Sequence, residues 1–279
     1  MHSRIWENIW ARAFSFNPVF LRDLAISFLR LPQIKNWGAL ARDHLRLSRD
    51  PHLVLEWRDG ARLQVRSGSS DGWTVQETIL TDYYRLARLK FANAILIDLG
   101  ANIGAFSILA ASRFPGARNY AYEPEPQNYA MLCANIALNG FEARIAPRAE
   151  GSSSDDRELA LSVTDNAAGH SHYWRGAETI RVPTASLKNI LAREGIARCD
   201  LLKMDIEGSE YETLYAADAA TLKKIARLYL EYHQLADVRE DYQARHLAEF
   251  LASQGFAVEQ FIINCTQGYL YCERIAPAD

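Results

Sequence analysis

Apolar stretches of strand length alternate with segments of helical period along most of the chain. In the clearest case, residues 95–97 form an apolar run, which is followed by an acid, a glycine turn and a helical pattern that ends near Pro115. A short uninterrupted apolar run is typical of a strand buried on both faces of a sheet. The same reasoning predicts strands at residues 120–122, 143–147, 159–163, 179–182, 199–204, 228–230, 256–263 and 269–273, and helices at 126–139, 185–192 and around 247–255. Strands that alternate with helices predict a doubly wound α/β sheet with a hairpin at the C-terminus.

The first part of the chain has a different character. Apolar residues recur at helical spacing from Trp6 to Phe14 and again from Phe20 to Leu31, and Lys and Arg outnumber Asp and Glu. A basic amphipathic helix can lie on an anionic membrane surface or dock against a partner, while packing on the main domain or on a second subunit is the more ordinary alternative. We therefore expect a helical extension at residues 1–47 and one domain at 48–279. A hairpin is predicted at 52–65, around a turn at Asp59-Gly60, and a helix at 73–89.

Composition narrows the class of protein. The 279 residues are 49% hydrophobic and 23% charged, which is ordinary for a globular protein, and a net charge of −3 gives no general attraction to nucleic acid. No apolar run approaches the roughly 18 residues that span a bilayer, and no cleavable signal pattern is visible. The four cysteines form no Cys-x-x-Cys pair, which indicates free thiols in a reducing compartment. The expected location is the cytoplasm.

Polar residues follow the predicted strands at the points where these strands end. Asp98, Glu123, Asp205 and the pair Glu231 and His233 each come directly after an apolar run. In open α/β sheets, ligands bind beyond the carboxyl ends of the strands. We therefore expect these side chains to meet at one edge of the sheet and to form a site there.

The turn after the central run reads Gly-Ala-Asn-Ile-Gly, from Gly100 to Gly104. A strand that leads through such a turn into a helix leaves backbone N–H groups free for an anionic ligand group. Glu123 follows Gly100 at about the spacing at which an acid commonly binds a ribose hydroxyl. The turn lacks the Gly-x-Gly-x-x-Gly pattern of dinucleotide sites, which disfavours a nicotinamide-dependent oxidoreductase. A nucleoside with an amino-acid tail, S-adenosylmethionine, fits: its carboxylate faces the helix and its ammonium group meets Asp98.

Three further blocks make the assignment more specific. They are Tyr122-Glu-Pro-Glu-Pro-Gln-Asn128, Asn135-Ile-Ala-Leu-Asn-Gly140 and Leu201-Leu-Lys-Met-Asp-Ile-Glu-Gly-Ser-Glu210, with Leu230-Glu-Tyr-His233 after them. Together with the glycine turn, these blocks resemble the FkbM-type methyltransferases, and the similarity extends over about residues 73–273. The resemblance implies a seven-stranded class I methyltransferase sheet and transfer of a methyl group from S-adenosylmethionine. It implies that Asp98, Gly100, Asn102 and Gly104 hold the methionine end of the cofactor. By family position alone, Glu77 is expected to line the same pocket.

Methyl transfer to a hydroxyl group needs a base, because the hydroxyl proton has a pKa far above neutral. Asp205 and His233 are candidates for the base and the residue that orients it, and Glu207 begins the turn after Asp205. The unperturbed pKa of histidine, roughly 6.5, favours His233 as the proton acceptor. Alternatively, Glu207 and Glu210 only cap the following helix.

A second interpretation uses overlapping residues. Asp205, Glu231 and His233 offer oxygen and nitrogen ligands for a divalent cation, which would acidify the hydroxyl group directly. We favour the version without a metal. His170 and His172, within the polar segment 165–172, are more consistent with an exposed or substrate-lining loop than with a metal site.

The sequence thus predicts an O-methyltransferase that acts on a hydroxyl group of a sugar, a glycolipid or a secondary metabolite. N- or C-methylation on the same scaffold is an alternative, and so is a cofactor-binding scaffold protein without turnover. The expected partner is a small-molecule or glycan acceptor and not nucleic acid. Residues 1–47 additionally offer peripheral membrane contact or homo-oligomerisation.

Overall fold

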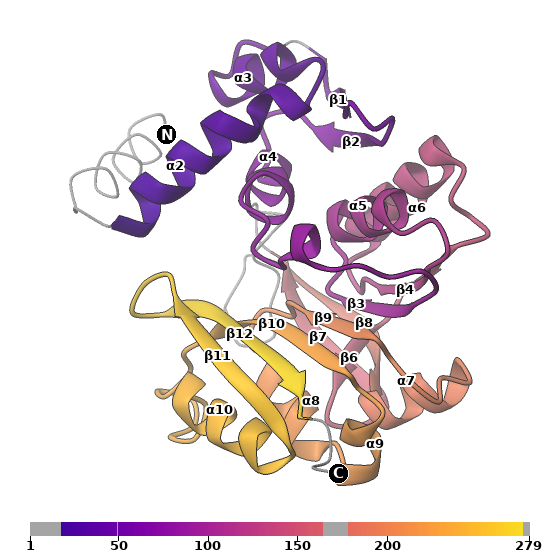
Figure 1. Ribbon diagram of the computed structural model, residues 1–279, viewed down its shortest axis with the longest axis vertical. Coiled ribbons are helices and arrows are strands. Elements are labelled where there is room, and N and C mark those ends of the chain that lie inside the picture. The colour runs from indigo at the N-terminus through magenta and orange to yellow at the C-terminus, as the bar shows by residue number, and fades with distance from the viewer. Residues whose placement is uncertain (1–17, 49, 164–177, 276–279) are drawn as a thin grey trace.

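The computed structural model describes residues 18–48, 50–163 and 178–275 (Figure 1). The helical pattern expected between Trp6 and Phe14 lies outside these residues, as do His170 and His172. Within the described ranges, none of the helices combines the length and the apolar character that crossing a bilayer requires.

A seven-stranded sheet organises the molecule, in the order β11-β12-β10-β9-β3-β4-β5. Its strands are β3 (Ile95–Leu99), β4 (Arg118–Tyr122), β5 (Ile145–Arg148), β9 (Leu201–Met204), β10 (Arg227–His233), β11 (Phe256–Ile262) and β12 (Gln267–Arg274). The strands from β10 to β5 pair in parallel, whereas β12 pairs antiparallel with both β10 and β11. The prediction of a mostly parallel seven-stranded class I methyltransferase sheet with a C-terminal hairpin is therefore confirmed.

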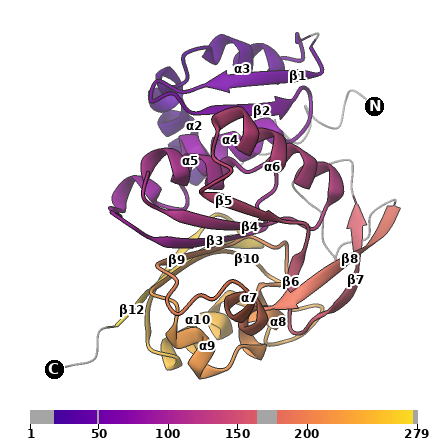
Figure 2. The ribbon, with the colours of Figure 1, turned by 90° about the vertical axis from the view of Figure 1, so that its right-hand side faces the viewer.

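Helices cover both faces of this sheet (Figures 1 and 2). One face carries α5 (Ala105–Arg113) and α6 (Pro126–Asn139), and the other carries α7 (Leu187–Arg193), α8 (Glu210–Ala216), α9 (Ala219–Lys223) and α10 (Ala244–Ser253). Every residue of β9 is buried, because both of its faces are covered, and this is the reason that it is apolar except for Lys203. Each helical layer has its own apolar core.

The ends of α6 follow the signals in its sequence. Pro126 occupies the first turn, and the Glu125 side chain accepts hydrogen bonds from the backbone N–H groups of Gln127 and Asn128. Gly140 ends the helix in the left-handed conformation, at φ 66°. Both features agree with the predicted helix at 126–139.

The strands predicted at 159–163 and 179–182 exist, but they do not belong to the main sheet. They form a separate three-stranded sheet, in the order β6-β8-β7, from β6 (Gly151–Ser153), β7 (Arg157–Val163) and β8 (Glu178–Ser186). β6 was not predicted. Its three small residues give no apolar alternation, so only its pairing with β8 defines it as a strand.

The segment before the central strand begins with α2 (Pro18–Arg30), η1 (Leu31–Gln33) and α3 (Trp37–His44). The predicted hairpin follows as β1 (His52–Glu56) and β2 (Arg62–Arg66). The single helix predicted at 73–89 is wrong beyond Leu80. α4 (Asp71–Val75) continues into one π turn, η2 (Gln76–Leu80), and the chain then turns irregularly before η3 (Leu86–Arg88). Asp82 and Arg85 adopt left-handed φ values of 56° and 52°, which no helix accommodates.

Candidate active site

A cavity of about 500 Å³ opens at the carboxyl ends of the central strands. This volume is in the range of small-molecule sites, which measure about 300–1,000 Å³. The predicted site residues that line it are Glu77, Gly100, Asn102, Glu123, Asp205, Glu207 and His233. Asp98 and Gly104 do not line the cavity.

The glycine turn fits tightly against the end of β9. A Cβ atom on Gly100 would lie 1.7 Å from the backbone oxygen of Asp205, and Gly100 has a left-handed φ of 76°, so only glycine fits here. The N–H groups of Gly100 and Ala101 both donate to the backbone oxygen of Tyr122, at 3.0 and 2.9 Å. Gly104 plays a different part, because it precedes α5 at φ 88° and a Cβ atom there would lie 2.7 Å from Leu132 Cδ1. It permits close packing of α5 and α6.

Glu123 is buried at the end of β4 and faces the cavity. Its Oε2 accepts a hydrogen bond from the Asn102 N–H at 2.7 Å, and its Oε1 accepts one from the Glu125 N–H at 2.9 Å. Burial raises the pKa of Glu123 to about 7. Each carboxylate oxygen can accept two hydrogen bonds, so Glu123 has the capacity to accept one more from a ligand hydroxyl group.

Asp98 lies fully buried below the turn and is already paired. Its Oδ1 is 3.0 Å from the Lys203 Nζ, and its Oδ2 accepts a hydrogen bond from the Ser107 hydroxyl at 2.6 Å. Lys203 Nζ also donates to the backbone oxygen of Gly100 at 2.5 Å and lies 3.8 Å from Asp205 Oδ2. Lys203 therefore connects the two strand-end acids to the glycine turn.

Sequence reasoning did not identify Lys203 as a functional residue. A signal was present, because a lysine inside an otherwise apolar buried strand requires an acidic partner. Burial lowers the pKa of Lys203, but the Asp98 and Asp205 carboxylates outweigh burial, and the net effect is a raised pKa. Lys203 is thus held as a cation between them.

Tyr84 was missed for a different reason. It lies in the irregular segment between η2 and η3, where no periodic pattern marks it. Its hydroxyl group donates to Asp205 Oδ2 at 2.8 Å, and the side chain is buried. Asp205 is therefore held from two sides, by a phenol and by a more distant ammonium group.

The pair of Glu207 and His233 occupies the cavity next to Asp205. His233 lies at the end of β10, as predicted: it is the last residue of this strand and pairs with Gln267 of β12. Its Nε2 is 3.5 Å from Glu207 Oε2, and its Nδ1 is 3.5 Å from Glu210 Oε1. Glu207 adopts a left-handed φ of 52°, an uncommon conformation for a residue with a side chain.

The pKa values of His233 and Glu207 are shifted by burial and by the charged groups around them. Burial lowers the pKa of His233, but the neighbouring carboxylates of Glu210, Glu207 and Glu231 outweigh it and raise this pKa well above its usual value. Burial raises the pKa of Glu207 to about 8, against the lowering effect of His233. These carboxylates favour the protonated imidazole, whereas the unperturbed pKa of histidine had favoured a neutral His233.

Glu210 has a structural role in the same turn. As the first residue of α8 it is fully buried, and its Oε1 accepts hydrogen bonds from the N–H groups of Ile206 and Gly208, each at 3.2 Å. The alternative that Glu210 fixes the helix start matches these contacts. Glu207, in contrast, lines the cavity.

The residues considered as metal ligands have other partners. Glu231 accepts hydrogen bonds from the Tyr269 hydroxyl at 2.9 Å and from the Gln267 amide at 3.3 Å. Burial, then the charge of Asp205, raises its pKa. In the part of the chain that the structure describes, no group of three or more His, Cys, Asp or Glu side chains is arranged to hold a metal ion.

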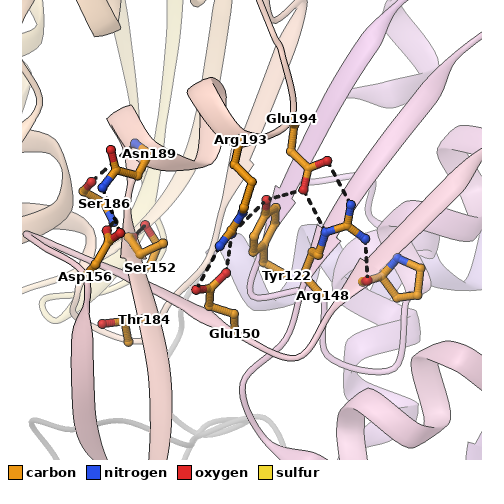
Figure 3. A network of polar contacts seen from close by, with 12 residues as sticks. Tyr122, Arg148, Glu150, Ser152, Asp156, Thr184, Ser186, Asn189, Arg193 and Glu194 are labelled. Atoms are coloured by element: carbon orange, nitrogen blue, oxygen red, sulfur yellow. Dashed lines mark hydrogen bonds and ion pairs between the residues drawn. The ribbon is translucent and has the colours of Figure 1, made fainter.

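A polar network connects α7 with neighbouring strands (Figure 3). The Tyr122 hydroxyl donates to Glu194 at 3.1 Å, and Arg148 pairs with the same carboxylate at 2.7 Å. Arg193 pairs with Glu150, directly before β6. β6 and β8 supply Gly151, Ser152, Val182 and Thr184 to the cavity lining. The network therefore joins α7 and the main sheet to the small sheet that closes the site.

Comparison with known protein families identifies the family of this chain. The family described as Methyltransferase FkbM domain matches residues 98–258, from the acid of β3 into β11. The chain belongs to this family.

Three individual relatives share between 25% and 28% of the aligned residues with this chain. This methyltransferase is 27% identical to Methyltransferase sdnD of Sordaria araneosa over 66% of this chain and 82% of that protein. It is 28% identical to AMB antimetabolite synthetase AmbE of Pseudomonas aeruginosa over 74% of this chain, but this region is only 12% of that synthetase. It is 25% identical to 31-O-demethyl-FK506 methyltransferase FkbM of Streptomyces tacrolimicus, over 59% of this chain and 73% of that enzyme.

The residues of this methyltransferase fit S-adenosylmethionine, the cofactor of the family. A buried acid, Glu123, lies at the end of β4 with hydrogen-bonding capacity directed to the cavity. Gly100 lines the same cavity and lets the glycine turn pack directly against the backbone of Asp205. The acids around Asp205 favour a positively charged ligand group, such as a sulfonium. The predicted cofactor thus agrees with the hydrogen-bond acceptors and the acidic side chains that line the cavity.

Proposed function

We propose that this methyltransferase transfers a methyl group to a hydroxyl oxygen of a small molecule or glycan, such as a sugar, a glycolipid or a secondary metabolite. The observation that carries the proposal is the pair of Glu207 and His233, which faces the cavity beside Asp205. A hydroxyl acceptor must lose a proton, and such a pair can take it. The FkbM relative from Streptomyces tacrolimicus supports this choice, since its name specifies an oxygen acceptor.

Cofactor binding is assigned to the turn and to β4. Glu123 accepts hydrogen bonds from the ribose hydroxyl groups, and Asn102, whose N–H already binds Glu123, sets the position of this carboxylate. Gly100 permits the turn to approach the backbone of Asp205 closely, and Glu77 of η2 lines the same cavity. Asp98 acts indirectly in this proposal, because both of its oxygens are engaged by Lys203 and Ser107. When bound, S-adenosylmethionine supplies an activated methyl carbon.

Proton removal is assigned to Glu207. Since the surrounding carboxylates favour protonated His233, this imidazole has no free nitrogen lone pair for a substrate proton. Glu207, with a pKa raised to about 8, is matched to a proton transfer near neutral pH. The acceptor O–H bond breaks as the new O–C bond forms, and the proton goes to Glu207 Oε. The S–C bond of S-adenosylmethionine would break in the same displacement, and its sulfur would leave as the neutral thioether of S-adenosylhomocysteine. His233 stabilises the carboxylate before transfer, and Asp205, held by Tyr84, orients the acceptor hydroxyl group.

N- or C-methylation and a scaffold without turnover are the competing functions. A neutral amine attacks before it loses its proton, so it has less need of a base in the cavity. A scaffold has no need of the left-handed conformation that directs Glu207 into the cavity. The first point favours oxygen over nitrogen as the acceptor atom, and the second favours an enzyme over a scaffold.

The experiment uses S-adenosylmethionine with an isotopically labelled methyl group and fractionated cell extract. We expect label in a product whose fragmentation identifies a methyl ether, and we expect the Glu207→Gln variant to lose most of this transfer while binding the cofactor normally in calorimetry. A labelled N-methyl or C-methyl product would contradict the proposed acceptor atom. Cofactor binding without transfer to any fraction would favour the scaffold.

A further inference from the structure

One face of α2 is apolar, and the residues that the structure describes do not cover it. Leu21, Leu24, Phe28 and Leu29 are between 54% and 77% exposed, and Leu21, Leu24 and Phe28 recur at the spacing of one helix face. No residue of α2 is buried. Four large apolar side chains together on one exposed helix indicate an interaction surface, because globular proteins rarely leave such a patch uncovered.

Exposed apolar side chains also occur in and just after α3. Trp37 is 48% exposed, and Leu45 and Leu47, just after the helix, are 60% and 65% exposed. Figure 1 shows α2 and α3 at the outer edge of the molecule, where α2 reaches the sheet through Arg22, which packs over the ring of Phe261 in the edge strand β11. The two helices are therefore accessible to a large partner.

Positive charge accompanies these apolar side chains. Lys35, Arg42 and Arg46 are exposed, and none of them forms an ion pair with the residues that the structure describes. Acids in the described residues 18–48 are limited to Asp23 and Asp43, although the chain as a whole has a net charge of −3. This segment is thus a basic, apolar region on an acidic protein.

Charge also decides between possible occupants. A second copy would make a two-fold contact in which the same surface is used twice, so two surfaces with an excess of positive charge would be brought together. An anionic lipid surface complements the cations and accepts the apolar and aromatic side chains at its boundary. We propose that α2, α3 and residues 45–47 form a surface that docks on anionic lipid membranes.

The docking surface lies against the segment that lines the cavity. His44 of α3 packs on Trp73, with ring centroids 5.8 Å apart, and Trp73 lines the cavity. Arg30 of α2 donates to the backbone oxygen of Leu80 at 3.2 Å, at the end of η2. Docking therefore holds the cavity beside lipid, within reach of a glycolipid or another lipid-linked hydroxyl group; this last step rests on the proposed function.

Vesicle sedimentation of the full chain tests the surface. We expect binding to vesicles of phosphatidylcholine with phosphatidylglycerol and much weaker binding to phosphatidylcholine alone. The double variant Leu24→Glu/Phe28→Glu should bind at least about tenfold more weakly, whereas Val238→Glu, at a comparably exposed apolar site outside the surface, should bind like the parent. Lys35→Gln/Arg42→Gln should lose on the order of fivefold per cation, since each contributes about 1 kcal/mol near an anionic surface.

Three results would overturn the proposal. The parent chain could fail to bind anionic vesicles, or the Leu24→Glu/Phe28→Glu variant could bind them as well as the parent. Light scattering could also show a dimer that this variant dissociates, which would assign the surface to a second copy. Calorimetry with S-adenosylmethionine separates this question from the methyl-transfer function, because the variant should bind the cofactor as the parent does.

Discussion

Replacement of Lys203 by methionine tests the connection between the cofactor turn and the strand-end acids. Lys203 and Asp98 are 4% and 0% exposed, and Lys203 Nζ is 3.0 Å from Asp98 Oδ1. Removing one partner of a buried ion pair costs about 3–5 kcal/mol, because the other charge remains unpaired. Lys203 also holds the backbone oxygen of Gly100. We therefore expect Lys203→Met to lower the free energy of unfolding by this amount and to weaken binding of S-adenosylmethionine.

Urea unfolding and calorimetry measure the two effects. Lys188→Met is the matched control, because Lys188 pairs with Asp218 at 3.2 Å on the surface, where the side chains are 68% and 48% exposed. An exposed pair contributes at most about 1 kcal/mol. The double variant Asp98→Asn/Lys203→Met should regain part of the loss, since it leaves no unpaired charge at position 98. A Lys203→Met variant that is as stable as the Lys188→Met control and binds the cofactor normally would refute the reasoning.

Two further predictions concern carboxylates of the cavity. Glu123→Ala should weaken S-adenosylmethionine binding by about 1.5–3 kcal/mol, the value of a hydrogen bond to a charged group, and calorimetry measures it against exposed Glu142→Ala; equal affinities would exclude the ribose contact. The pKa of Glu207, about 8, places its carboxylate form above that pH, so kcat/KM should rise with pH to a plateau above about 8. A rise that persists unchanged in Glu207→Gln would show that another group is the base.

The main sheet was predictable because the burial of each strand is visible in the residues of that strand alone. Helices cover both faces, so strands such as β3 and β9 are apolar apart from the paired Asp98 and Lys203, and this leaves a clear pattern in the sequence. The glycine turn was also predicted from the sequence. The structure explains why Gly100 is needed there, because no other residue combines its φ with the closeness of Asp205. Parallel strands also place their carboxyl ends at one edge, which is how Glu123 and Asp205 were expected in one site.

Other features depend on contacts between distant segments. The helix expected at 73–89 ends early, in a segment that places Tyr84 against Asp205, and no local pattern carries that information. β6 exists only through its partner strand β8. The protonation of His233 could not be predicted, because it depends on Glu210, Glu207 and Glu231 together, and sequence gives no distances between them.

The crowding of acids also bears on when the base becomes active. Asp205 contributes to the raised pKa of both Glu207 and Glu231, so negative charge in the cavity suppresses ionisation of the base. A positive charge brought into the cavity favours the ionised carboxylate and lowers this pKa. The sulfonium of S-adenosylmethionine carries such a charge. Glu207 is therefore mostly protonated in the empty cavity at neutral pH, and it ionises more readily when the methyl donor is bound.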